Sequence, residues 1–101
     1  MVRHEVQFVL RFGVFEEFRS LIEQLRSIEQ GQGRPEPRCW RASAGRVNEM
    51  VIAHEYADRP AYDVQRDAYH DSADAAFREA LDRLAELMVP GTATEILYEE
   101  L

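Results

Sequence analysis

The sequence contains no lysine, since all twelve of its basic residues are arginines. Enzymes that form a Schiff base, bind pyridoxal phosphate or hold a nucleotide in a P-loop use a lysine amine for that step. These three kinds of chemistry are therefore excluded. Nineteen Asp and Glu outnumber the arginines and give a formal net charge of −7. Such a surface repels phosphate backbones, so we expect no nucleic-acid partner.

Cysteine occurs once, as Cys39, so neither an internal disulfide nor a paired-cysteine site can form. No apolar run approaches the ~20 residues of a membrane span, and residues 1–11 are too polar for a secretory signal. We therefore expect a cytoplasmic protein with no membrane partner. The 101 residues, 46% of them hydrophobic, predict a single domain over 1–101 with its own core.

Six segments with regular hydrophobic periods follow one another along the chain. Strict alternation predicts strands, and helical spacing of apolar residues predicts amphipathic helices. Strands are expected at 4–12, 38–44, 48–56 and 94–101, and helices at 15–29 and 61–88. Asp58 is the expected N-cap of the second helical region, which Asp71 and Ser72 could interrupt and re-cap. The order β-α-β-β-α-β is typical of the α+β, ferredoxin-like class, a four-stranded antiparallel sheet with helices on one face.

The helices can cover only one face of this sheet. Alternation assigns to the covered face Val6, Phe8, Leu10, Phe12, Trp40, Met50, Ile52 and Ile96. The opposite face then holds Gln7, Val9, Arg11, Cys39, Arg41, Glu49, Val51, Ala53, Glu55 and Leu97. The second set mixes aliphatic residues with both signs of charge, whereas a solvated face is cleanly polar. We therefore predict a homodimer closed through this sheet face, with a solvated face as the alternative.

His54 is the candidate general base. Alternation places it under the helices beside Tyr56, near the end of a strand, and an imidazole side chain exchanges protons at neutral pH. Tyr56 and Asn48 are the other candidate catalytic residues, which would orient a substrate. The alternative for His54 is a structural histidine that hydrogen-bonds to a helix group.

Four further side chains are candidate ligand-binding residues. Trp40 could form one wall of a cleft for an aromatic or apolar ligand, while Tyr62, Arg66 and Tyr69 recur at helical spacing and could line its mouth. The alternative for all four is packing in the core, at an interface or on a helix surface.

No metal and no cofactor is predicted. The three histidines fall on three different segments without the short spacing that zinc ligands use, and Gly31-Gln32-Gly33 follows a helix rather than the strand that a dinucleotide loop requires. Cys39 could act as a nucleophile, but no histidine is placed beside it in the sequence. A lone cysteine is more often a small buried hydrophobe.

With this element order, the chain resembles the dimeric α+β barrel superfamily and, within it, the NIPSNAP-like group. The resemblance covers nearly the whole chain and is carried by Val6–Gly13, Phe15–Phe18, Cys39–Arg41, Gly45–Glu49, His54–Tyr56 and Val89–Gly91. It implies the ferredoxin-like fold, a dimer, and a candidate site drawn from Trp40, Arg41, Asn48, Glu49, His54 and Tyr56. Members of the superfamily include cofactor-independent monooxygenases and lactone isomerases.

The sequence leaves two alternative functions undecided. One is a small-molecule-binding homodimer, acting as a cofactor-independent monooxygenase or isomerase on an apolar or aromatic ligand held between sheet and helices. The other is a non-catalytic protein-interaction module in which His54 is structural. The sequence does not decide whether the protein is an enzyme.

Overall fold

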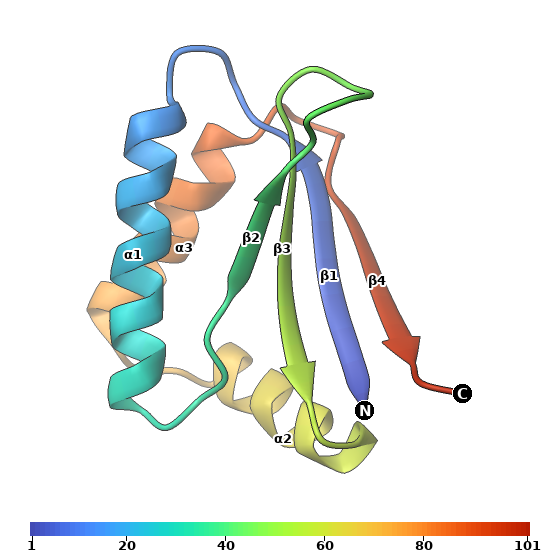
Figure 1. The fold of residues 1–101 in the computed structure, drawn as a ribbon. Coiled ribbons are helices and arrows are strands. Elements are labelled where there is room, and N and C mark those ends of the chain that lie inside the picture. The colour runs from blue at the N-terminus through green and yellow to red at the C-terminus, as the bar shows by residue number, and fades with distance from the viewer.

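A computed structural model describes the whole chain, residues 1–101. Its elements follow the order β1 (Val2–Val9), α1 (Phe15–Gly31), β2 (Arg38–Arg41), β3 (Glu49–Tyr56), α2 (Arg59–His70), α3 (Ala75–Leu87) and β4 (Thr94–Glu99). The strands form one antiparallel sheet in the order β2-β3-β1-β4. Figure 1 shows α1 and α3 side by side against this sheet and α2 across its lower end. The predicted ferredoxin-like class is confirmed.

Two aspartates set the starts of the last two helices. The Asp58 carboxylate accepts a hydrogen bond from the Ala61 amide at 2.9 Å, as predicted for the N-cap of α2. Asp74 caps α3 in the same way, so the chain is interrupted where expected, although Asp74 rather than Asp71 or Ser72 is the new cap. The interruption lets α2 turn away from α3 and lie against the end of β3.

The core lies between the sheet, α1 and α3. It comprises Phe8, Leu10, Phe18, Leu21, Ile22, Leu25, Met50, Ile52, Phe77, Ala80, Leu84 and Leu87. The rings of Phe8 and Phe18 meet edge to face with their centroids 5.9 Å apart, an arrangement that aromatic quadrupoles favour. At the surface, Arg83 of α3 donates to Glu17 of α1 at 2.8 Å. None of the helices combines the length and apolar character needed to cross a bilayer.

The side chains of strand β2 lie on the opposite faces of the sheet from those predicted. Trp40 lies opposite Val51 on the uncovered face, whereas Cys39, opposite Ile52, and Arg41 face the helices. The predicted faces of Trp40, Cys39 and Arg41 were therefore wrong. With only four residues, β2 offers an apolar side chain to each face, and its register against β3 decides which one is covered.

The predictions for β4 and the end of β1 were also wrong. Ile96 lies on the uncovered face, and Leu97, opposite His4, faces the helices. Ile96 and Leu97 are adjacent and both apolar, so alternation alone does not decide which of the two is covered by the helices. Phe12 is 80% exposed because β1 ends before it and the chain turns there.

The uncovered sheet face is more aromatic than predicted. The guanidinium groups of Arg3 and Arg38 lie 4.9 and 5.0 Å from the Trp40 ring, within range of a cation–π interaction. Half-buried Val51 and buried Ala53 lie beside them on β3. This face combines a flat apolar centre with arginines, and no element of the chain covers it.

Candidate functional site

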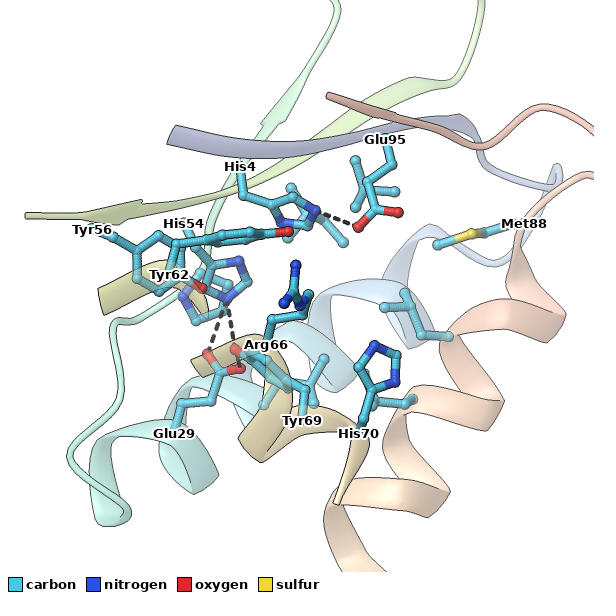
Figure 2. A pocket seen from close by; sticks show the side chains of 16 residues that line it. His4, Glu29, His54, Tyr56, Tyr62, Arg66, Tyr69, His70, Met88 and Glu95 are labelled. Atoms are coloured by element: carbon cyan, nitrogen blue, oxygen red, sulfur yellow. Dashed lines mark hydrogen bonds and ion pairs between the residues drawn. The ribbon is translucent and has the colours of Figure 1, made fainter. Parts of the chain in front are cut away.

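A cavity of about 260 Å³ lies between the covered face of the sheet and the helices. Its floor includes Val6 and Ile52 from the sheet, and Leu25 and Leu84 close it from α1 and α3. Most of the wall is apolar, and the polar side chains that enter it come from five different elements. They include His4, Glu29, His54, Arg66, Tyr69 and Glu95 (Figure 2). A cavity of this size and character suits a small, mostly apolar ligand.

His54 is held by two side chains from the helices. Its Nε2 lies 3.2 Å from Oε2 of Glu29 on α1 and 3.3 Å from the hydroxyl of Tyr69 on α2. The Tyr69 hydroxyl in turn donates to Oε1 of Glu29. Glu29 is only 2% exposed, so these three groups satisfy one another away from solvent, as buried polar groups must.

The pattern of donors fixes which nitrogen of His54 is left without a hydrogen-bond partner. The Tyr69 hydroxyl hydrogen is already used on Glu29, so Nε2 of His54 must carry the hydrogen that points at this carboxylate. Nδ1 then holds the lone pair, which is the requirement for a general base. Glu29 therefore orients the imidazole as the carboxylate of a catalytic triad does.

The tyrosines of the site are held in the protonated form. Burial, assisted by the hydrogen bond to Glu29 and by its charge, raises the pKa of Tyr69 well above the ordinary range. Burial also raises the pKa of Tyr56 to about 12. Tyr56 packs between His54 and Tyr62, with ring centroids 6.4 and 5.5 Å away. At neutral pH both hydroxyls are therefore hydrogen-bond donors and not bases.

A second histidine–carboxylate pair lines the same cavity. Nε2 of His4 on β1 lies 2.6 Å from Oε1 of Glu95 on β4. His4 is the direct cross-strand partner of His54, and the Tyr62 ring lies 5.7 Å from its ring. Glu95, unlike Glu29, keeps 70% of its side chain exposed.

Five of the candidate site residues lie together in this cavity. Besides His54 and Tyr56, these are the three α2 residues Tyr62, Arg66 and Tyr69. In Figure 2 the Arg66 side chain extends from α2 toward the centre of the cavity. Helical spacing explains the grouping, since positions i, i+4 and i+7 share one face of α2.

The structure places the other candidates elsewhere. Trp40 lies on the uncovered sheet face, and Arg41 packs its guanidinium 4.8 Å from the Phe15 ring. Asn48, in the left-handed region with φ 59°, ends a long β2–β3 loop, because β2 ends at Arg41 and not at residue 44 as predicted. It is six residues from His54 along an extended strand, or ~20 Å, and does not line the cavity.

Glu29 is the member of this hydrogen-bonded group that sequence reasoning missed. Ile22, Leu25 and Glu29 follow one another at helical spacing, so Glu29 falls on the buried stripe of α1. A carboxylate on a buried stripe is itself a signal, because it requires a partner. His4 and His70 were also missed. All three histidines line one cavity, yet no group of three His, Cys, Asp or Glu is arranged to hold a metal ion.

Cys39 lies outside the cavity. Burial raises the pKa of its thiol to about 11, so the nucleophilic thiolate is scarce at neutral pH. This position and this pKa fit a packing role for Cys39 better than a role as a nucleophile.

Comparison with known proteins gives a fold but no closer relationship. No family model matches the chain, and no curated protein matches it. Among solved structures, a NIPSNAP domain protein from Burkholderia xenovorans is 17% identical, with a TM-score of 0.76 over 100% of this chain and 95% of that one. A NIPSNAP family protein from Agrobacterium tumefaciens is 15% identical, with a TM-score of 0.75 over 99% and 85% of the two chains. An antibiotic biosynthesis monooxygenase is 14% identical, with a TM-score of 0.70 over 100% and 99%.

The sheet order and the helices packed against one sheet face define a ferredoxin-like α+β protein. More particularly, the chain has the fold shared by NIPSNAP domain proteins and antibiotic biosynthesis monooxygenases. At these identities the likeness establishes the fold, while function has to be argued from the site.

Proposed function

We propose that this protein binds a small apolar ligand in the cavity between sheet and helices and that His54 acts on it as a general base. The main support for this proposal is the hydrogen-bonded group of Glu29, Tyr69 and His54. It leaves one imidazole nitrogen unbonded at the wall of an apolar cavity. Burying a carboxylate merely to hold a histidine is costly, since a well-packed apolar residue is often as stabilising. A functional imidazole explains why the group is there.

A bicyclic phenol tests this proposal without knowledge of the natural ligand. β-Naphthol places an apolar ring system in the cavity and its hydroxyl at His54. At ten times its dissociation constant, it should stabilise the folded state by roughly 1.4 kcal/mol and raise Tm on the order of 5–10 °C. His54→Gln, which removes the basic nitrogen, should weaken binding and reduce this shift. The measurement is thermal unfolding by circular dichroism across a β-naphthol titration.

Arg46→Gln is the control, because Arg46 is exposed in the loop between β2 and β3. It should leave the shift caused by β-naphthol unchanged. An equal shift in wild type and His54→Gln would remove His54 from the site. No protection of the wild type would favour the alternative, a non-catalytic protein-interaction module in which His54 is structural.

We also propose that the protein is a homodimer closed through the uncovered sheet face. Its apolar centre around Trp40 and Val51, together with Arg3 and Arg38 and with Glu49 and Glu55 on β3, supports pairing of opposite charges across a two-fold axis. Arg41, which alternation assigned to this face, faces the helices instead, so Arg3 and Arg38 supply the positive charge. The monooxygenase and isomerase alternatives are both compatible with such a dimer.

Native mass spectrometry should therefore detect twice the mass of one chain. Val51→Glu places a charge in the centre of the face and should shift the protein to monomer. Val64→Glu makes the same change on α2, where Val64 is 66% exposed, and should leave the dimer intact. A wild-type monomer would refute the proposed face, and so would a Val51→Glu dimer as stable as that of wild type.

A further inference from the structure

The two histidine–carboxylate pairs line the same cavity but differ in their exposure to solvent. The His54–Glu29 pair is largely buried, with 13% and 3% of the two side chains exposed. The His4–Glu95 pair opens to water through Glu95, of which 70% is exposed. Both imidazoles are bonded to their carboxylate through Nε2, so each has Nδ1 left for a ligand.

The register of the sheet brings the two imidazoles close together. His4 and His54 are directly opposite on β1 and β3 and point to the same face, and side chains in this relation have Cβ atoms about 5 Å apart. Two imidazoles so spaced can reach neighbouring or next-but-one carbon atoms of one bound molecule. His70 also lines the cavity, but its side chain has no carboxylate partner.

Building on the proposed function, we propose that His4 is a second catalytic residue and that the protein moves a proton between two carbons of a small unsaturated ketone. His54 Nδ1 removes a proton from the carbon between carbonyl and double bond, and the C–H electron pair passes into a dienolate. His4, which carries a hydrogen on each ring nitrogen at the start of the cycle, then donates the one on Nδ1 to the γ-carbon, and the double bond moves into conjugation with the carbonyl. The proton on Nδ1 of His54 is lost to water through the exposed part of its side chain, and His4 takes up another, so the cycle consumes no net proton. No bond to oxygen forms or breaks and no oxidant is consumed.

The difference in exposure assigns the two roles. Glu29 holds the base in one orientation, with Nε2–H directed at the carboxylate and the lone pair on Nδ1. His4 must be reprotonated after each turnover, and the exposed Glu95 connects it to solvent. Arg66 lines the cavity (Figure 2) and also pairs with Asp63 and Asp67 on its own helix. From there it can stabilise the negative charge that develops on the carbonyl oxygen of the dienolate.

The test follows β,γ-cyclohexenone by proton NMR in deuterium oxide. Loss of the α-hydrogen signal from remaining substrate reports proton removal, and the conjugated isomer reports the complete transfer. In His4→Gln the isomer should form ~10²-fold more slowly, as expected for loss of a general acid. Exchange at the α-carbon should continue, so the ratio of exchange to isomerisation rises. His54→Gln should lose both processes.

Glu95→Gln provides a second variant in case His4→Gln does not fold, because its exposed side chain can be changed without opening the core. It should raise the same ratio, whereas Glu100→Gln, a matched change of an exposed residue just beyond β4, should leave both rates unchanged. A purely structural His4 would lower both rates together and overturn the inference. A wild type that neither exchanges nor isomerises this ketone would also overturn it. In either case the proposed function stands if β-naphthol binds through His54 and fails if it does not.

Discussion

Replacing Phe77 with alanine should lower the free energy of unfolding by ~3–5 kcal/mol, as found for large aromatic deletions in cores. Phe77 is fully buried. Its ring stacks on Tyr69 with a centroid distance of 5.3 Å, and the Arg34 guanidinium lies 4.6 Å from it. A domain of this size has ~5–15 kcal/mol of stability in total. The loss is measured by urea denaturation followed by circular dichroism.

Phe12→Ala is the matched control, because it removes the same side chain from a position that is 80% exposed. Its effect should stay within ~0.5 kcal/mol. Phe77→Ala should also weaken β-naphthol protection, since Tyr69 loses the ring that positions it above the cavity. Equal losses in the two phenylalanine variants would show that the core is not packed around Phe77.

Replacing Glu29 with alanine should cost ~2–4 kcal/mol, an unusually large effect for a charged residue. Two buried donors, the Tyr69 hydroxyl and Nε2–H of His54, would lose their acceptor. An unsatisfied buried polar group costs ~1–3 kcal/mol, and the 3.3 Å approach of these two groups to each other recovers part of it. The measurement is again urea denaturation.

Glu23→Ala provides the control on the same helix. Its carboxylate is 71% exposed and pairs with Arg26, and exposed pairs contribute little, with a median of ~0–1 kcal/mol. The double variant Glu29→Leu with Tyr69→Phe removes an acceptor and a donor together, so it should be more stable than the sum of the two single changes predicts. Additive losses would mean that Glu29 and Tyr69 do not act as a unit.

The sequence predicted the order of elements because each long element buries one continuous stripe or face. The α1 stripe and the alternation of β3 required no tertiary information, and Asp58 marked the start of α2. The faces of β2 and β4 were not predictable in this way. Both are edge strands whose side chains on either face are compatible with burial, so pairing with the neighbouring strand decides.

The site residues likewise divide into those that the sequence could predict and those that require the tertiary structure. The hydrophobic period of a single element predicts the face on which each of its residues lies. This was enough to find His54 and the α2 residues Tyr62, Arg66 and Tyr69. The partnership of His4 with Glu95 spans ninety-one positions in sequence. It depends on β1 and β4 being neighbours, which only the sheet order supplies.

Helix α2 supplies four side chains to the cavity, yet none of its own residues is buried. Its contacts with the rest of the chain are made by a few half-buried side chains, chiefly Tyr62, which meets the rings of His4 and Tyr56, and Tyr69, which stacks on Phe77 and donates to Glu29. Segments of this kind open with a free energy well below that of global unfolding. We therefore expect α2 to open locally while the sheet, α1 and α3 stay folded, which would give a molecule a route into the cavity.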